Sequence, residues 1–403
     1  MPGAEPARDA VDRPAAVAAV IGVGVVGSIV FLVLPFLVGA FTDELGLSRE
    51  RVGYLGSADM LGMFVAAALA TLWVRRFDWR RVAALALAIL VGCHLISSLV
   101  DGFAPLAAVR ALAGFAGGSL MAIALTALGD GRNPDRHFAL FISGQLGLGA
   151  LLLGLIPAVI ERFGLDGIFL SLAGVTAVAW GLVSMVPRSG RPTAADRGAQ
   201  RSSFGLLPGL AALGACFVFN LGVMAVWAYM ERIGVAADLP KETIGSALGL
   251  SLLAGLGGAL LAALLVDRFG RVLPLTLTVA LQLVALGLVA RGGAIGYAIG
   301  AMLFSFCWNF PVAYQLAITV RVDPSARLVV LFLGAVKLGY ALGPAAAGLL
   351  LVPGGSYAPA LWLGSACFVV SGAGYVALAR LAVRLATRSP SAALDRSPKE
   401  VSS

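Results

Sequence analysis

About twelve apolar runs fill this chain, and one basic, polar linker divides them into two sets of six. A helix needs ~20 mostly apolar residues to cross the ~30 Å hydrocarbon core of a bilayer. Only helices and closed barrels satisfy every backbone polar group in lipid. The runs are too long for barrel strands and lack their alternating pattern. The sequence therefore predicts an all-α membrane protein with twelve transmembrane helices in two six-helix bundles.

The predicted spans are separated by short loops and cover residues 16–40, 52–73, 82–100, 104–129, 137–160, 167–187, 207–230, 243–266, 272–290, 294–318, 328–352 and 357–383. The longest polar stretch between them is rich in Arg, Pro, Gly and Ser, which is typical of a flexible linker. We therefore divide the chain into an N-terminal tail (1–15), a first bundle (16–187), a linker (188–206), a second bundle (207–384) and a disordered C-terminal tail (385–403).

The basic residues predict the orientation of the protein. Arginine gathers in the loops that share a side with both tails, and the positive-inside rule places such loops in the cytosol. We therefore expect a multi-pass protein of the inner (plasma) membrane with both termini cytoplasmic. The same distribution explains the net charge of +8 without a nucleic-acid partner. The expected partners are the lipid bilayer, protons and a small-molecule substrate, and we expect a monomer.

Several kinds of chemistry are not indicated by the sequence. Its four cysteines, Cys93, Cys216, Cys307 and Cys367, each lie alone in an apolar run, without metal-ligand spacing. The sequence shows no phosphate loop, nucleophile motif or polar region large enough for an ATPase domain. We expect no metal, no cofactor and no enzymatic activity, so an ion or substrate gradient must supply the energy. No carboxylate cluster suggests a sodium site, which favours protons.

Only three fully ionisable side chains lie more than one helical turn from the ends of the predicted spans: Asp59, Arg110 and Lys337. A charge in hydrocarbon is costly and is found where it has a partner or lines a cavity. These residues are therefore the first candidates for function.

Three local patterns point to a known family. The turn Val266–Arg271 reads VDRFGR, and a degraded copy after the second span, Arg75–Arg81, has Arg75 and Asp78 where Asp and Gly are expected. The fourth span carries RALAGFAGG from Arg110 to Gly118. In these motifs, in span number and in linker position the chain resembles the major facilitator superfamily of secondary transporters. The resemblance implies two pseudo-symmetric bundles, with spans 1, 4, 7 and 10 lining a central cavity.

The resemblance also implies a gating role for the basic turns. Asp267 can cap the next helix, and Arg268 and Arg271 can reach carboxylates or helix C-termini, with Arg76 as a first-bundle counterpart. Such a network would lock the cytoplasmic side. The alternative is a set of basic turns that only obey the positive-inside rule.

Spans 2 and 11 face each other by the same resemblance. Asp59 and Lys337 differ in depth by roughly 8–10 Å, at 1.5 Å per residue, and a lysine stem covers much of that. We predict that they pair in one access state and separate in the other, so that Asp59 takes up a proton. Alternatively, Asp59 caps its span or reaches the outer interface, and Lys337 reaches cytosolic phosphates.

The resemblance implies that Arg110 takes part in proton coupling. Alternatively, Arg110 is a packing arginine that is bonded to backbone carbonyls. With Lys337 it gives the spans an excess of positive charge, which favours an anionic substrate. The other candidate substrate contacts are polar or aromatic: Trp308, Asn309 and Gln315 in span 10, Asn220 in span 7, Tyr340 in span 11 and Phe31 in span 1. His94 is expected to be a hydrogen-bonded structural histidine. Trp227 is a further candidate in span 7, but we favour an interfacial aromatic belt for Trp227 and Tyr229.

The sequence thus favours a secondary transporter that works by alternating access and takes up a small organic anion, such as a carboxylate, with protons. One alternative is a proton-driven exporter of a hydrophobic or cationic compound. Another is a non-transporting membrane sensor.

Overall fold

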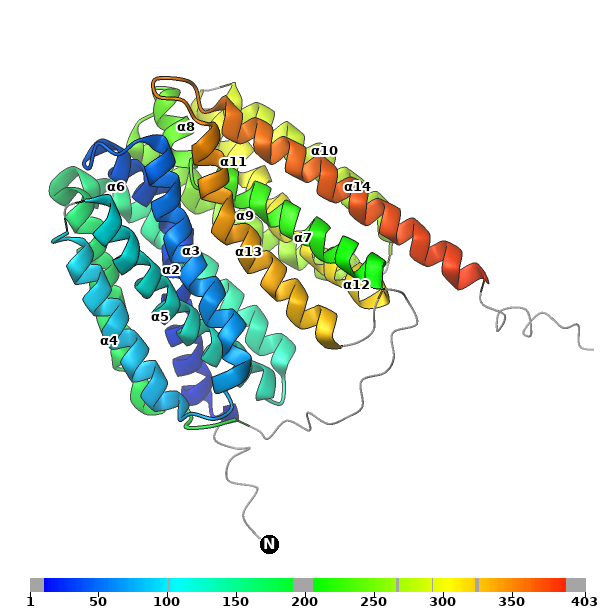
Figure 1. Ribbon diagram of the computed structural model, residues 1–403, viewed down its shortest axis with the longest axis horizontal. Helices are drawn as coiled ribbons and strands as arrows, with labels where there is room; N and C mark the ends of the chain where they lie inside the picture. The colour runs from blue at the N-terminus through cyan, green and yellow to red at the C-terminus, as the bar shows by residue number, and fades with distance from the viewer. Residues whose placement is uncertain are drawn as a thin grey trace, which may run out of the picture.

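The computed structural model describes residues 11–100, 102–190, 206–265, 268–291, 293–322 and 326–388, and all regular structure in them is helical. The first bundle contains α2 (Pro14–Asp43), α3 (Arg49–Trp73), α4 (Trp79–Ser97), α5 (Phe103–Asp130), α6 (Pro134–Trp180) and the short 3-10 helix η1 (Val183–Met185). The second bundle, shown with the first in Figure 1, contains α7 (Leu206–Trp227), α8 (Met230–Ala236), α9 (Lys241–Leu265), α10 (Val272–Ala290), α11 (Ala294–Asn309), α12 (Val312–Val322), α13 (Ala326–Leu350) and α14 (Ala358–Arg388).

Eleven segments of the described chain are long and apolar enough to cross a membrane. One of them runs for 52 residues through α6 and η1, more than twice the ~20 residues that a bilayer requires. At Gly164 its backbone leaves the helical region, with φ 60° and ψ −150°, and only glycine adopts such a conformation without strain. Glu44 accepts a hydrogen bond from the amide of Leu165 at 2.9 Å, just after this break. This segment therefore contains two spans, and the twelve-span prediction is confirmed.

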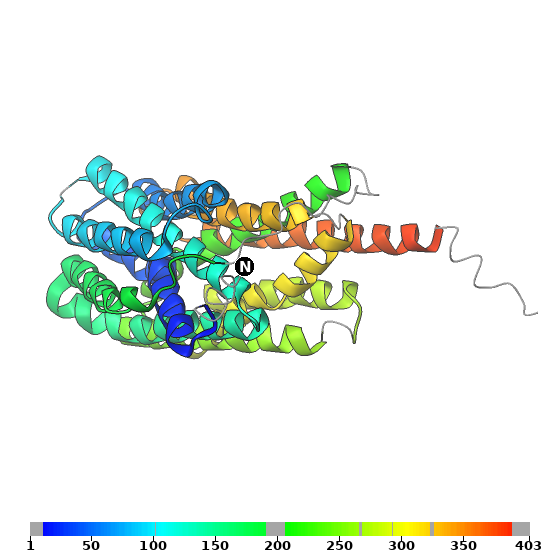
Figure 2. The ribbon, with the colours of Figure 1, turned by 90° about the horizontal axis from the view of Figure 1, so that it is seen from below.

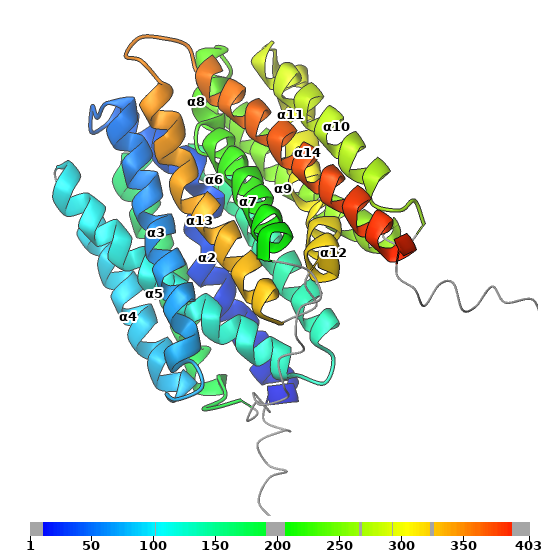
Figure 3. The same cartoon turned by 45° about the vertical axis from the view of Figure 1, so that its right-hand side comes forward.

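The two bundles repeat one packing pattern. In the first bundle α3 packs on α5 and α2 on α6, and in the second α9 packs on α11 and α7 on α13. Two seams join the bundles: α3 lies along α13, and α6 along α9. Figures 1 and 3 show α3 and α13 side by side, and Figure 2 shows the bundles from below. The predicted proximity of spans 2 and 11 is therefore confirmed.

The two bundles share two ends, which we call the linker end and the far end. At the linker end, α2 begins and α14 ends, and the amide of Trp79 donates to the carbonyl of Arg188 at 2.8 Å. The far end, uppermost in Figure 1, carries α8.

Two spans of the second bundle are interrupted. Span 10 breaks between α11 and α12, at Pro311, which has no N–H to continue the helix. Span 7 breaks after Trp227, and the separate helix α8 then carries Glu231 and Arg232 at the far end. The first break therefore follows directly from a residue visible in the sequence, Pro311.

Candidate functional site

Four aromatic side chains meet where the two bundles face each other. Trp308 of α11 donates a hydrogen bond from Nε1 to the hydroxyl of Tyr340 on α13, at 2.9 Å. Phe31 of α2 lies beside both, with ring centroids 6.4 Å from Trp308 and 6.1 Å from Tyr340. Trp227 of α7 lies 5.9 Å from Trp308 and donates from Nε1 to the carbonyl oxygen of Phe31, at 2.9 Å. We call these four residues the aromatic cluster.

Lys337 lies against this cluster. Its Nζ is 5.7 Å from the ring centroid of Phe31, 5.6 Å from that of Tyr340 and 3.5 Å from Sδ of Met121 on α5. No carboxylate in the described part of the chain forms an ion pair with it. Contact with aromatic faces is worth only ~0.5–2 kcal/mol. The site therefore presents a cation whose charge no carboxylate of the described residues neutralises.

A second polar site lies inside the first bundle, where Asp59 of α3 and Arg110 of α5 form an ion pair. Arg110 donates from Nε to Oδ2 at 2.8 Å and from Nη2 to Oδ1 at 2.7 Å. Its Nη1 lies 3.3 Å from Nδ1 of His94 and 3.4 Å from Oγ of Ser97, both on α4. The guanidinium is also 5.3 Å from the ring centroid of Phe169. The Arg110 side chain is 0% exposed, and its fork geometry uses both oxygens of Asp59.

Close approach of α3 and α5 makes this pairing possible, and Gly114 is the residue that permits it. A Cβ at Gly114 would overlap the backbone carbonyl of Asp59, whereas a Cβ at Gly147 would meet nothing within 4 Å. We expect Gly114→Ala to destabilise the protein by about 1–3 kcal/mol, as overpacking does. Thermal melting of the purified protein tests this, with Gly147→Ala as the matched control. Equal melting temperatures for the two variants would contradict this role of Gly114.

These contacts bear on two predictions from the sequence. Lys337 and Asp59 are apart in this conformation, because Arg110 occupies both carboxylate oxygens, and their pairing in another access state stays a prediction. Arg110 does not line a cavity, because it is fully enclosed between α3, α4 and α5. The cause is the rotation of α3, which turns Asp59 toward α5 rather than toward α13.

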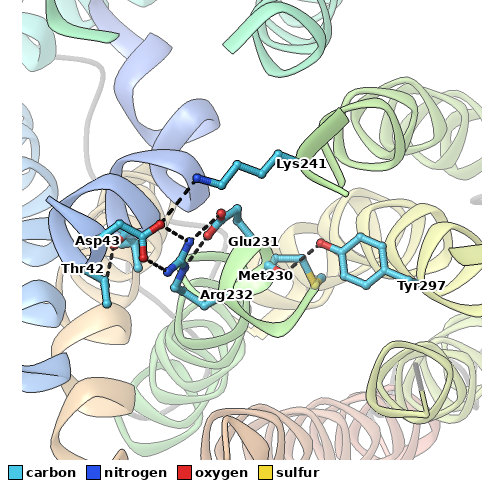
Figure 4. A network of polar contacts seen from close by, with 8 residues as sticks. Thr42, Asp43, Met230, Glu231, Arg232, Lys241 and Tyr297 are labelled. Atoms are coloured by element: carbon cyan, nitrogen blue, oxygen red, sulfur yellow. Dashed lines mark hydrogen bonds and ion pairs between the residues drawn. The ribbon is translucent and has the colours of Figure 1, made fainter. Parts of the chain in front are cut away.

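The far end carries a network that links the two bundles, shown in Figure 4. Arg232 of α8 binds Asp43 of α2 through Nη1–Oδ1 (2.5 Å) and Nη2–Oδ2 (3.0 Å). It also binds its neighbour Glu231 through Nε–Oε2 (2.6 Å) and Nη2–Oε1 (2.8 Å). Lys241 lies 3.6 Å from Asp43, and the Tyr297 hydroxyl donates to the carbonyl of Met230 at 2.8 Å. We call Asp43, Glu231, Arg232 and Lys241 the far-end network.

Further contacts hold the bundles together at the same end. Arg49 of α3 donates from Nη1 to the carbonyls of Val352 and Gly355, at 3.1 and 2.7 Å, and its guanidinium lies 4.3 Å from the ring centroid of Tyr357. The hydroxyl of Tyr229 donates to the carbonyl of Arg49 at 3.1 Å. The far end is therefore closed by polar contacts between the bundles.

The predicted gating residues lie at the linker end. Asp267 is outside the described residues, and Arg268 is exposed. Arg271 donates from Nη1 to the carbonyl of Ala317 at 3.0 Å, which ties the start of α10 to α12. That contact lies within the second bundle, and the predicted lock stays a prediction.

In the first bundle, Arg75 rather than the predicted Arg76 binds a carboxylate at the linker end. Arg76 is exposed. Its neighbour Arg75 binds Asp130 at the end of α5, through Nη1–Oδ2 (2.5 Å) and Nη2–Oδ1 (2.8 Å). Asp78 caps α4 by accepting from the amide of Arg80 at 2.9 Å.

Among the described residues, three predicted substrate contacts make no hydrogen bond to the aromatic cluster. Asn309 donates to the carbonyl of Ser305 at 3.0 Å, and Asn220 donates to the carbonyl of Cys216 at 2.8 Å. Gln315 is buried on α12. Of the predicted contacts, the structure brings together Phe31, Trp308, Tyr340 and Lys337.

Trp227 was wrongly assigned to an interfacial belt. It is fully buried, and so is Tyr229, because both lie where span 7 breaks and turns into the seam. The far-end network was also missed, since Asp43 is far in sequence from the other three members and each member occurs near a span end, where charges are common.

A cavity of about 850 Å³ opens at the linker end between α2 and α6. Its lining is mostly apolar, and the polar residues in it are Asp12, Arg132, Asn133, Arg136 and His137. It does not include the aromatic cluster or Lys337.

Comparison with known proteins identifies the fold. A model of the Major Facilitator Superfamily matches residues 19–327. The structure is similar to that of a D-xylose-proton symporter, with a TM-score of 0.72 and 14% identity over 90% of this chain and 96% of that one. It is also similar to the nucleoside transporter NupG, with a TM-score of 0.70 and 14% identity over 91% and 99%.

A third similar structure comes from work on proton dependent oligopeptide transporters, with a TM-score of 0.70 and 12% identity over 92% of this chain and 98% of that one. At these identities the likeness shows the fold alone. A search of curated proteins finds no match.

Proposed function

Because this chain belongs to the major facilitator superfamily, and so is a multi-pass membrane transporter rather than an enzyme, we propose that it takes up a small organic anion together with protons by alternating access. The observation that carries the choice of substrate class is Lys337, a cation without a carboxylate partner among the described residues, placed where both bundles meet.

The surroundings of Lys337 support an anion with an apolar or aromatic body. Phe31 and Tyr340 offer ring faces beside Nζ, and Trp308 extends the same wall. A carboxylate bound to Lys337 would supply the missing countercharge, while its body packs against the rings. Because α2 and α13 belong to different bundles, such a ligand would touch both halves, as alternating access requires.

For the proton we propose the pair of Asp59 and Arg110. A buried carboxylate paired with an arginine stays ionised, and it takes up a proton when the pair opens. Opening the pair requires α3 to move relative to α5, and the packing of α3 along α13 of the other bundle can couple that movement to rocking of the bundles. The proposed coupling is therefore within the first bundle and separate from the substrate site.

We further propose that the far-end network is the outer gate. With both termini in the cytosol, as the arginine distribution predicts, the far end faces outside and is closed in this structure. The linker end, with Arg75, Arg271 and the predicted Asp267 contacts, then carries the inner gate.

Ligand binding to purified protein tests the substrate class. In a thermal-shift screen of organic acids, amines and sugars, we expect organic acids to stabilise the wild type. Lys337→Met should weaken that binding by about 10–100-fold, since hydrogen bonds to charged groups contribute about 1.5–3 kcal/mol. Lys337→Arg, which keeps the charge, should retain part of it.

Two outcomes would contradict the proposal. One is stabilisation by amines but not by acids, which would favour an exporter of cationic compounds. The other is equal binding of the same acid by the wild type and by Lys337→Met.

A further inference from the structure

His94 on α4 is a buried titratable group that the proposed function does not yet use. Its side chain is 0% exposed, and its Nδ1 lies 3.3 Å from Nη1 of Arg110. Its other ring nitrogen, Nε2, is buried and has no hydrogen-bond partner in the described part of the chain. Ser97, one turn further along α4, places Oγ 3.4 Å from the same Nη1.

The contact with Arg110 determines which form of the imidazole is present. A guanidinium has only donors, so Nδ1 must offer its lone pair as the acceptor. The proton of the neutral ring then sits on Nε2. A second proton on His94 would remove that lone pair and place two cations in contact inside the membrane. His94 is therefore an acceptor for Arg110 rather than a carrier of protons.

Arg110 is held from two sides by different kinds of acceptor. Nε and Nη2 face the charged Asp59, whereas Nη1 faces the neutral His94 and Ser97. When Asp59 takes up a proton, it ceases to be the countercharge, but the acceptors on α4 remain. They would keep the guanidinium in place, ready to bind Asp59 again when the proton leaves.

We propose that His94 is a positioning residue that holds the Arg110 fork toward Asp59 and thereby sets the pH at which Asp59 exchanges its proton. This inference rests on the proposed proton coupling through Asp59. The titratable or charged groups around the imidazole in the described structure are Arg110 on α5, Asp59 on α3 and Cys93 on its own helix. Arg110 is the one in direct contact with it.

Three variants test the role by the pH dependence of substrate uptake in proteoliposomes. His94→Leu removes the acceptor, so Arg110 should leave Asp59 more readily and the carboxylate should protonate more easily. The midpoint of the pH profile should move about one unit toward alkaline pH, a tenfold change in proton affinity. His94→Asn keeps an oxygen near the position of Nδ1 and should stay close to the wild type. His137→Asn, at the linker end, alters the only other histidine and should cause no shift.

The outcomes separate this inference from the proposed function. Unshifted midpoints in both His94 variants, with a pH-dependent wild type, would overturn the positioning role and leave the coupling proposal intact. Equal shifts in His94→Leu and His94→Asn would overturn it as well, because the acceptor would then not matter. A wild-type profile that does not depend on pH would contradict the coupling through Asp59 and this role with it.

Discussion

Arg110→Leu is expected to abolish transport and to destabilise the protein by about 3–5 kcal/mol, the usual cost of removing one partner from a buried ion pair. Asp59 would remain as a carboxylate enclosed by α3, α4 and α5, without the guanidinium that binds both its oxygens. Unfolding of the purified protein in detergent measures the first effect, and uptake in proteoliposomes measures the second.

A double variant separates stability from function at this site. Replacing a whole buried ion pair with apolar side chains of similar volume is often neutral for stability. Asp59→Leu combined with Arg110→Leu should therefore recover most of the stability that Arg110→Leu loses, while uptake stays absent. A double variant that transports with an unchanged pH profile would show that the pair does not carry the proton.

Arg232→Gln is expected to open the far end. Arg232 is the cation between Asp43 and Glu231, so its loss leaves Glu231 buried without a countercharge and brings two carboxylates face to face. The closed state should lose several kcal/mol relative to the open one, since breaking a buried pair costs about 3–5 kcal/mol. Spin labels on the loops 44–48 and 237–240, measured by pulsed electron resonance, should report a longer distance between the bundles.

Lys241→Gln is the matched control for this experiment. Lys241 contacts Asp43 at 3.6 Å, and both side chains are partly exposed, at 41% and 43%. Exposed ion pairs contribute only about 0.2–1 kcal/mol, so the distance distribution should stay close to that of the wild type. An unchanged distribution in Arg232→Gln would mean that the far-end network is not the gate.

The architecture was predictable because it rests on local signals. The length of each apolar run sets a span, Pro311 marks the break in span 10, and a polar linker separates the bundles. The proximity of α3 and α13 came from the family resemblance, and the packing confirms it. Gly164 was not recognised as the junction of spans 5 and 6, although the predicted loop between them contained it.

The partner of Asp59 was not predicted, because depth along a helix follows from residue number whereas rotation depends on packing. A signal was present nonetheless. Gly62 follows Asp59 by three residues and Gly114 follows Arg110 by four, so each charge shares a helix face with a glycine. Small residues on facing surfaces allow close helix contact in membranes. That pattern indicates that α3 and α5 meet at these charges.

The far-end network and the role of Trp227 depend on features that single residues do not show. Asp43, Arg232 and Lys241 come from three helices, and only the closed arrangement of the bundles brings them together. Trp227 resembles an interfacial aromatic residue until the break after α7 is known. The isolation of Lys337 in mid-span, by contrast, is visible directly in the sequence, and its role in substrate binding stays a prediction.

Uptake by proteoliposomes with an imposed pH gradient tests the central claim most directly, using the organic acid that gives the largest thermal shift. An inwardly directed proton gradient should drive accumulation of the acid by the wild type, and Lys337→Met should abolish it while Lys337→Arg retains part. Accumulation of the acid by Lys337→Met at the wild-type rate would contradict proton-coupled uptake of an anion at Lys337. A flux of the acid that does not depend on the proton gradient would contradict it as well.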